Sequence, residues 1–596
     1  THTGTGGELY YTKEQYSSLQ QDAADRGIEL LMELDTPGHS TPYTKYVYEN
    51  QEEVIRALAD HNYLEESDYF NADGSLKDGA SFYIHNPNYF ELLSIDEESG
   101  NTVERQNAIN ARIFMTALFD EYLGGSDPLV KAKTVNAGVD EYWDHSKGNA
   151  FRRYMNFMQE LLGEKYGKEV RMWGSLNNFP GNTQVNKDII IEVWNTSEES
   201  PLARIAEGFR VINIPQPYMY TTPGRYHKDM VNEAFVYYNW DPVIFNGNIR
   251  AEKGEPLLLG AKAVLWGDEN REGITEADLN ERYVRLAAML SEKTWGGTKE
   301  DDTFLEYEQT FDRLREGPGT HIANRIKSKS NVVLDYDFSN LSADGTVIYD
   351  ASGNGYHGKV TGGSAAVIDG SQMLAFDGQT LIETPLESLG YPYTMSFDVY
   401  LDNAAQNTKE SSLFCGYDGR LQVAGLNGEL SLNRDYFTQS FGYTAQAGEK
   451  HRITIVGTYQ ATKLYVDGRF QKILYAAASD PDHGGNIGAS TWADQDNNYR
   501  TTFVFPLNEI GKDFYGYLGN IKAYNKALSV EELAAEGDIS AHEVDVARNR
   551  RAYTDNQNPS YLGDTMRLYP GWKATDGDGH VTGAEGVSAS NESRWN

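Results

Sequence analysis

The segment that most constrains this chain is VNAGVDEYW, residues 135–143. A short run of apolar and small residues leads directly into two adjacent carboxylates, Asp140 and Glu141, and two aromatic residues follow. Such a run is typical of a buried parallel strand. Acidic residues at the end of such a strand lie where α/β barrels build their active sites. The competing interpretation is that the two acids form a solvated turn.

The first half of the chain alternates between strand and helix patterns. Apolar residues at helical spacing predict helices over residues 12–26, 107–122, 151–166 and 275–293. Short apolar runs predict strands over residues 28–34, 133–139, 170–173, 189–194, 210–214 and 261–266. This alternation favours a parallel barrel, but six strands are two fewer than a closed (β/α)8 barrel needs. We therefore expect an incomplete TIM barrel over residues 1–326 whose first strands are missing.

Several predicted strands end on polar or aromatic residues. These are Asp35 with His39, Asp140 with Glu141, Trp173, Trp194, and Trp266 with Asp268, and the loop at 215–224 adds Tyr218 and Tyr220. A single tryptophan is more often a core residue than a ligand. Because the carboxyl ends of barrel strands meet at one mouth, however, this set predicts a carbohydrate pocket. Indole faces would stack on sugar C–H groups, and carboxylates would accept hydrogen bonds from hydroxyls.

The motifs carry a resemblance. The first half of the chain resembles glycoside hydrolase family 20 in four motifs. These are MELDTPGHS at 32–40, the strand that ends in Asp-Glu, a strand that ends in Trp-Gly, and LSEKTWGG at 290–297. That family contains β-N-acetylhexosaminidases and lacto-N-biosidases. The resemblance covers about residues 7–297. It implies a retaining exo-glycosidase for β-linked terminal N-acetylhexosamine, in which the substrate's own acetamido oxygen attacks the anomeric carbon and forms an oxazolinium intermediate.

The resemblance also implies roles for individual residues. Glu141 would be the general acid/base, and Asp140 would hold the acetamido N–H. Tyr220 would donate to the acetamido oxygen, with Tyr218 as the competing choice. Asp35 and His39 would steady the two acids, although His39 could instead only cap its loop. The substrate-binding residues would be Trp173, Trp194, Trp266 and Asp268. The resemblance implies no metal or cofactor for catalysis.

Two departures from the family pattern leave alternatives open. Many hexosaminidases have Glu at the position of Asp268, and the shorter acid favours a lacto-N-biosidase that releases a disaccharide. The family's first strand supplies an arginine for the sugar hydroxyls, and no residue here corresponds to it. A third alternative is a non-catalytic glycan-binding surface protein. The intact Asp140–Glu141 pair and the tryptophans argue against that alternative.

From residue 331 onward, alternating strands with turn signals predict an antiparallel β-sandwich. Residues 331–540 resemble a laminin-G-like, concanavalin-type jelly roll. The motifs that carry this resemblance are DASGNGYHGKV at 350–360, LYVDG at 464–468 and YLGNIKAYNKALSVEEL at 517–533. Such modules bind glycans in some proteins and only pack against an enzyme in others. Residues 541–596 resemble the start of a discoidin-type family 32 carbohydrate-binding module, a partial β-sandwich. Asp576 and Asp578 could lie near a structural calcium or form a plain turn.

The composition of the chain limits the classes of partner that it is expected to bind. The net charge is −36, from 52 basic and 88 acidic residues, which disfavours nucleic acid as a partner. The sequence contains no run of about 18 apolar residues, so it predicts no membrane-spanning helix. The single cysteine, Cys415, allows no intrachain disulfide, which does not exclude secretion. We expect oligosaccharide or glycoprotein glycans as partners, and an extracellular or cell-surface location for a secreted bacterial protein.

Overall fold

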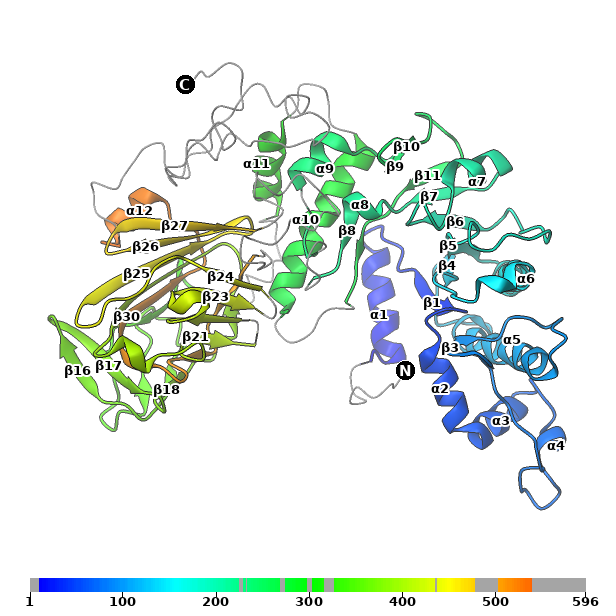
Figure 1. Ribbon diagram of the computed structural model, residues 1–596, viewed down its shortest axis with the longest axis horizontal. Coiled ribbons are helices and arrows are strands. Elements are labelled where there is room, and N and C mark those ends of the chain that lie inside the picture. Colours follow the sequence, from blue (N-terminus) through cyan, green and yellow to red (C-terminus); the bar gives the residue numbers. More distant parts are fainter. Residues whose placement is uncertain are drawn as a thin grey trace. The chain divides into compact units, whose positions relative to one another are not determined.

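The computed structural model (Figure 1) describes residues 10–223, 229–231, 233–267, 274–296, 303–315, 326–417, 419–434, 437–476 and 502–538. The chain forms two compact units. The first comprises Thr1–Gln216 and Pro242–Lys262, and the second comprises Pro217–Asp241 and Ala263–Asn596. The predicted discoidin-type module, with Asp576 and Asp578, lies outside the described residues, and so does Asp268.

A parallel six-stranded sheet forms the centre of the first unit. Its strands, in spatial order, are β1 (Met32–Thr36), β4 (Thr134–Gly138), β5 (Glu169–Trp173), β6 (Ile190–Val193), β7 (Val211–Asn213) and β11 (Leu258–Ala261). Because spatial order follows chain order and neighbouring strands are parallel, the sheet is a series of βα units like that of an α/β barrel. The predicted alternation of strands and helices is therefore confirmed.

Two predicted strands were misplaced. The strand expected at 28–34 lies at Met32–Thr36, so Asp35 is inside the strand and not after it. Before Met32 the Glu29 carboxylate, rather than the strand backbone, accepts the backbone N–H of Lys133. The strand expected at 261–266 is two strands, β11 and β12 (Val264–Leu265). Residues 257–259 are all leucine. The Leu257 carbonyl accepts from the Val211 N–H and Leu258 pairs with Val211 of β7, so this strand starts earlier than predicted.

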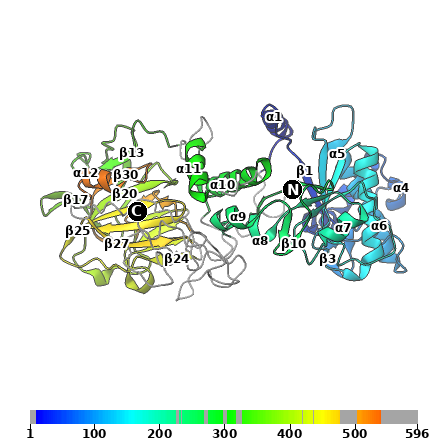
Figure 2. The same ribbon diagram turned by 90° about the horizontal axis from the view of Figure 1, so that it is seen from above.

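Helices α5 and α6 share the apolar core of this sheet (Figure 2). The helices of the first unit are α1 (Lys13–Ala24), α2 (Thr41–Glu49), α3 (Gln51–Asp60), α4 (Glu66–Tyr69), α5 (Thr102–Leu123), α6 (Gly148–Gln159) and α7 (Pro201–Glu207). A capping box formed by Thr12 and Gln15 opens α1. The helix predicted over 151–166 instead ends at Gln159 and continues as a π-helical turn, Glu160–Lys165. The Gln159 amide fills the space that a Cβ would occupy at Gly163.

Two hairpins in the first unit were not predicted. They are β2 (His85–Asn86) with β3 (Tyr89–Leu93), and β9 (Ile244–Asn246) with β10 (Ile249–Arg250). The β2–β3 hairpin contacts the loop after β1, because the Ser40 N–H donates to the Glu91 carbonyl and the Leu93 N–H donates to the Pro37 carbonyl. This hairpin therefore supports the loop that carries His39.

The second unit begins with short elements that follow α8 (Gln216–Met219). Strand β8 (Tyr220–Thr221) pairs in parallel with β12, and the helices are α9 (Glu233–Asn239), α10 (Glu276–Trp295) and α11 (Phe304–Leu314). The predicted helix over 275–293 is confirmed as α10, and its N-cap Thr275 accepts from the Asp278 N–H. No helix in the described ranges is long and apolar enough to cross a membrane.

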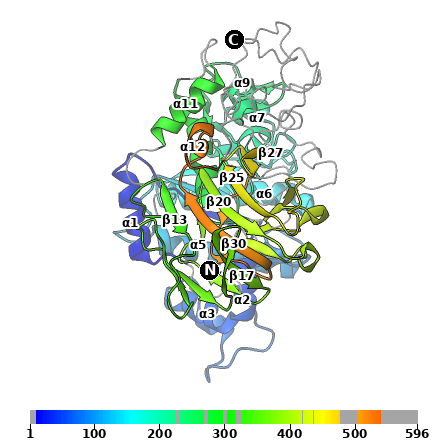
Figure 3. The same ribbon diagram turned by 90° about the vertical axis from the view of Figure 1, so that its left-hand side faces the viewer.

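Two antiparallel sheets follow and share one apolar core. One contains β13 (Val332–Tyr336), β16 (Ala365–Ile368), β17 (Ser371–Asp377), β20 (Tyr393–Tyr400), β25 (Lys450–Gly457), β26 (Ala461–Val466), β27 (Arg469–Tyr475) and β30 (Tyr515–Tyr524). The other contains β14 (Val347–Ile348), β15 (Gly358–Thr361), β18 (Leu381–Glu383), β21 (Ser412–Gly416), β22 (Gly419–Gln422), β23 (Ser431–Arg434), β24 (Phe437–Ser440) and β29 (Glu509–Ile510). Strands β19 (Ser388–Leu389) and β28 (Phe505–Pro506) pair separately, and α12 (Val530–Ala535) follows β30. Figure 3 shows β20, β25 and β30 side by side. This arrangement agrees with the predicted antiparallel sandwich.

Candidate active site

The backbone around Asp140 and Glu141 is unusual. Gly138, Val139 and Glu141 all have positive φ angles, of 73°, 81° and 46°, and His39 in the neighbouring loop has a φ of 45°. A β-branched residue such as Val139 rarely adopts the left-handed region because its side chain crowds the backbone. Strained conformations of this kind concentrate at functional sites, where the surrounding structure enforces them. The strain therefore marks the ends of β1 and β4 as a candidate site.

Two glycines allow the loops after β1 and β4 to approach each other. A Cβ on Gly138 would lie 1.8 Å from Asp35 Oδ1, and a Cβ on Gly38 would lie 2.4 Å from the Asp140 carbonyl oxygen. Both distances are too short for any side chain. The glycines in the two motifs, TPGHS and AGVDE, are therefore required for the close approach of Asp35 to the acidic pair.

Replacing Gly138 with alanine is expected to destabilise the first unit far more than replacing Gly167. Both glycines have positive φ, but nothing lies within 4 Å of a Cβ at Gly167. The Gly167→Ala change should therefore cost only the backbone strain, about 1 kcal/mol. The Gly138→Ala change adds the overlap with Asp35, about 1–3 kcal/mol more. Urea denaturation of both variants measures the difference, and equal midpoints would show that the close approach is not required.

Four titratable side chains meet at this point. His39 Nε2 lies 3.2 Å from Glu141 Oε2 and 3.8 Å from Asp140 Oδ2. One oxygen or nitrogen atom from each of Asp35, His39 and Asp140 lies within 4.8 Å of the others. The two adjacent acids differ in environment, because the Asp140 side chain is 16% exposed and the Glu141 side chain is 46% exposed. The structure thus brings together the four residues that the sequence placed after two different strands.

Burial and mutual charge set the protonation of this cluster. Burial raises the pKa of Asp140 to about 6. Burial, and then the charge of Asp140, raise the pKa of Asp35 well above its usual range. The hydrogen bond to Glu141 raises the pKa of His39 to about 9. At neutral pH His39 is therefore a cation beside an ionised Asp140, and the raised pKa of Asp35 shifts this carboxyl toward its protonated form.

Within the described residues, Asp35, His39 and Asp140 form the group that lies close enough together to hold a metal ion. Metal coordination needs a neutral imidazole. Because the pKa of His39 is raised to about 9, the imidazole is protonated at neutral pH and has no free lone pair. The protonated donor set can transfer a proton and hydrogen-bond to a substrate, and a metal ion would have to displace the His39 proton in order to bind.

Trp173 lies inside the first unit and is only 2% exposed. Its indole N–H donates to Glu33 Oε1 at 3.0 Å, and the Lys262 ammonium lies 4.3 Å from its ring centre. Lys262 also donates to the fully buried Glu192 at 2.8 Å. Sequence reasoning missed Glu33, Glu192 and Lys262. Charged residues inside otherwise apolar parallel strands were the signal that could have found them, because such residues are buried only when paired.

The other predicted aromatic residues are placed in two groups. Trp194, in the first unit, is half-buried and donates its indole N–H to the Gly174 carbonyl at 3.2 Å. In the second unit, the ring centres of Tyr220 and Trp266 lie 6.0 Å apart, and the backbone N–H of Trp266 donates to the Thr221 carbonyl. Tyr218 instead stacks on Phe235, with ring centres 6.0 Å apart. The structure therefore places Tyr220 beside Trp266 and Tyr218 beside Phe235.

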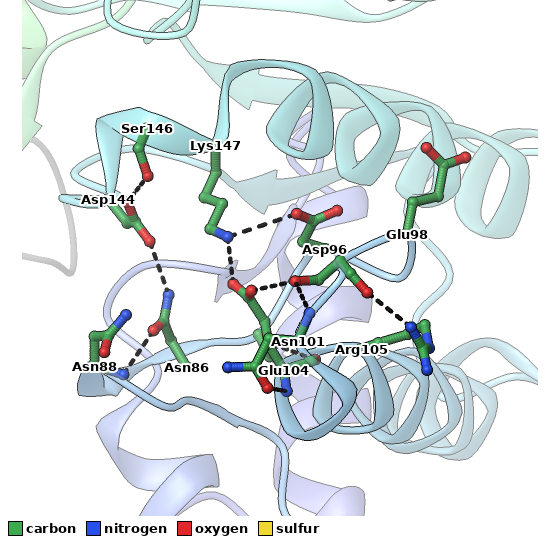
Figure 4. A network of polar contacts seen from close by, with 12 residues as sticks. Asn86, Asn88, Asp96, Glu98, Asn101, Glu104, Arg105, Asp144, Ser146 and Lys147 are labelled. Atoms are coloured by element: carbon green, nitrogen blue, oxygen red, sulfur yellow. Dashed lines mark hydrogen bonds and ion pairs between the residues drawn. The ribbon is translucent and has the colours of Figure 1, made fainter.

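The segment after Glu141 is anchored by buried polar contacts, some of which Figure 4 shows. The Tyr142 hydroxyl, almost fully buried, donates to the Leu93 carbonyl and accepts from Asn86 at 3.1 Å. Asp144 accepts from the same Asn86 amide at 3.3 Å. Lys147, which follows Ser146 and directly precedes α6, also pairs with Glu104 at 2.6 Å. Glu141 is therefore presented from a fixed loop, and Tyr142 is a core residue.

Comparison with known proteins finds relatives of the first half of the chain. The model of the family "Glycosyl hydrolase family 20, catalytic domain" matches residues 1–298. A lacto-N-biosidase of Bifidobacterium bifidum is 25% identical over 312 residues, which are 51% of this chain and 25% of that protein. The β-hexosaminidase subunit beta of Mus musculus is 22% identical over 309 residues, 51% of this chain and 49% of that protein. The solved β-N-acetylhexosaminidase of Bacteroides fragilis matches with 16% identity and a TM-score of 0.35, over 52% of this chain and 56% of that one.

The chain therefore spans a quarter to a half of the length of these curated relatives. The family match covers half of the chain and includes both Asp140 and Glu141. It confirms the resemblance of the barrel sequence, and it favours an enzyme over the non-catalytic alternative. This chain belongs to glycosyl hydrolase family 20, whose catalytic domain implies a TIM-barrel-like fold.

Proposed function

We propose that the protein is a retaining, substrate-assisted exo-glycosidase that hydrolyses β-linked terminal N-acetylhexosamine from oligosaccharides or glycoconjugates. The observation that carries this proposal is the unequal environment of two adjacent acids. Asp140 is largely buried beside a protonated His39, whereas Glu141 is half-exposed. Unequal environments of this kind separate two carboxyl groups into different roles.

Glu141 is the group that can reach a glycosidic oxygen, because almost half of its side chain is open to solvent. As the general acid it would give its proton to the leaving group, and as the general base it would later take one from water. His39 holds Glu141 in place through the contact at 3.2 Å. The imidazolium would also stabilise the carboxylate that Glu141 becomes after the proton is given up.

Asp140 is suited to hold the acetamido group of the substrate. As a carboxylate it would accept the acetamido N–H, which makes the acetamido oxygen a better nucleophile. Family resemblance assigns Tyr220 as the donor to that oxygen, and its contact with Trp266 favours it over Tyr218, which stacks on Phe235. Asp268 lies outside the described residues, and its role stays a prediction.

The raised pKa of Asp35 supports a nucleophile that comes from the substrate. A retaining enzyme with a protein nucleophile needs a second ionised carboxylate across the sugar ring from the acid. Asp35 is the remaining carboxyl in the cluster, and its raised pKa favours the protonated form, which is a poor nucleophile. The acetamido oxygen of the substrate would then supply the attack, and the configuration at the anomeric carbon would be retained.

Replacing His39 with glutamine is expected to move the acid limb of kcat/KM to higher pH. That limb follows the ionisation of Asp140, whose pKa is about 6. The positive charge of His39 holds this pKa down, so its removal raises the pKa and the carboxylate is lost at a higher pH. The pH dependence of aryl N-acetylglucosaminide hydrolysis measures the limb. A limb that stays in place or moves to lower pH would contradict the assignment.

A second candidate is a lacto-N-biosidase that releases a disaccharide. The 25% identity to the Bifidobacterium bifidum lacto-N-biosidase favours it, as does an aspartate at position 268. The test is the release of nitrophenol from β-linked GlcNAc, GalNAc and lacto-N-bioside by the full-length gene product. Release from a monosaccharide substrate supports the hexosaminidase, and release from the disaccharide alone supports the biosidase.

A further inference from the structure

Two segments of the second unit carry candidate substrate-binding residues, and each of them also contributes an aspartate to one buried cluster. The chain passes Tyr220 and reaches Asp229 nine residues later. It also passes Trp266 and reaches Asp278, in the first turn of α10, twelve residues later. The side chains of Asp229 and Asp278 are 1% and 0% exposed. Buried carboxylates at these two places need partners, because a lone buried charge is strongly unfavourable.

The partners are two buried arginines, and the four charges form a closed ring. Arg282 of α10 pairs with Asp229 at 2.9 Å and with Asp278 at 3.0 Å. Arg434 of β23 pairs with the same two aspartates, at 2.9 Å and 3.2 Å. The Tyr391 hydroxyl donates to Asp278 at 3.2 Å. Each aspartate therefore contacts both arginines, and the four charges sum to zero.

Arg434 joins the sandwich to these two segments. It is the member of the ring that comes from a sandwich strand, and its side chain is fully buried. Met230, next to Asp229, lies in the apolar core of the sandwich, and Ala277, next to Asp278, packs against the same core. Both ring aspartates are thus flanked by residues that pack on the sandwich.

We propose that Arg434 is a positioning residue for the glycosidase, and that the β-sandwich acts through it as a structural part of the enzyme. It fixes the ends of the segments that carry Tyr220 and Trp266, and so holds these two rings in contact. The inference rests on the proposed function for its effect on catalysis. An independent glycan-binding module would need no such buried tie to the segments that carry Tyr220 and Trp266.

The test compares Arg434→Met with Arg452→Met in the full-length protein. Arg452 of β25 is a matched control, because it also pairs with two aspartates, Asp398 at 3.3 Å and Asp538 at 2.9 Å, within the sandwich. If Tyr220 loses its place, Arg434→Met lowers kcat for an aryl N-acetylglucosaminide by about 10²-fold, with little change in KM. Arg452→Met leaves kcat unchanged within about twofold.

Hydrogen–deuterium exchange supplies a readout that does not depend on activity. Peptides that cover residues 217–223 and 263–267 are expected to exchange faster in Arg434→Met and not in Arg452→Met. If Arg434→Met does not fold, the charge-balanced double variant Arg434→Met with Asp278→Asn replaces it, and the same two results are expected. Wild-type kcat together with unchanged exchange in both peptides would overturn the positioning role. A wild-type protein that is inactive would instead refute the proposed function, and the exchange alone would then decide the role of Arg434.

Discussion

Replacing Glu141 with glutamine is expected to lower kcat for a natural β-linked N-acetylhexosaminide by about 10²–10⁴-fold. The variant keeps the shape of the side chain and removes the proton that the leaving sugar needs. The loss should be largest for sugar leaving groups, which leave poorly without protonation, and smaller for the bond-breaking step of nitrophenyl substrates. Steady-state kinetics on both substrate types measure this difference.

The matched control is Glu66→Gln. Glu66 has a similar exposure, 50% of its side chain, and a cationic partner in Arg56, but it lies on α4. Its replacement should leave kcat unchanged within about twofold. In Glu141→Gln the pKa of His39 should also fall, because the hydrogen bond to Glu141 is the main cause of its increase. An NMR titration of His39 reports this change. Near wild-type kcat in Glu141→Gln would refute the general acid assignment.

Replacing Asp140 with asparagine is expected to have the second largest effect, a loss of about 10²–10³-fold in kcat. A neutral amide cannot stabilise the positive charge that develops on the acetamido group as the oxazolinium forms. The acid limb of the pH profile near pH 6 should also disappear, because the group that titrates there is gone. A pH series of kcat/KM for wild type and variant measures both effects.

The Asp140→Asn variant should lose activity without losing stability relative to the wild type. The pKa of Asp140 is higher in the folded protein than in the unfolded chain, so the folded state binds the proton more tightly. In the wild type, the Asp140 carboxyl therefore contributes to the free energy of unfolding at low pH, and this contribution is lost as the pH rises through about 4 to 6. At pH 7 the variant should be at least as stable as wild type in urea denaturation. A variant that is inactive because it unfolds would contradict this expectation.

Local patterns predicted the parts of the fold that depend on neighbouring residues. Helices α1 and α10 begin at Thr12 and Thr275 as expected, because a cap acts within one turn. The parallel strands were recognised from their apolar runs, although the first and last were misplaced where a side chain or a leucine run altered the pairing. The β2–β3 hairpin was missed, because β2 has only two residues and shows no alternation.

Features that join distant residues could not be predicted in the same way. The adjacent acids Asp140 and Glu141 were visible as a motif, but their unequal burial depends on the fold around them. The contact of Glu33 with Trp173 spans 140 residues, and the contact of Arg434 with Asp229 spans 205. A charged residue in a strand shows that a partner is needed and does not identify the partner. The interior network and the buried ring therefore required the structure.

The most direct test of substrate-assisted catalysis compares two substrates that differ only at the 2-position. The full-length gene product is given 4-nitrophenyl β-N-acetylglucosaminide and 4-nitrophenyl β-glucoside, and initial rates are measured at pH 7. If the acetamido oxygen is the nucleophile, only the first substrate is cleaved, with a rate ratio on the order of 10³ or more. Comparable rates for the two substrates would contradict the proposed mechanism, because the glucoside has no acetamido group to attack the anomeric carbon.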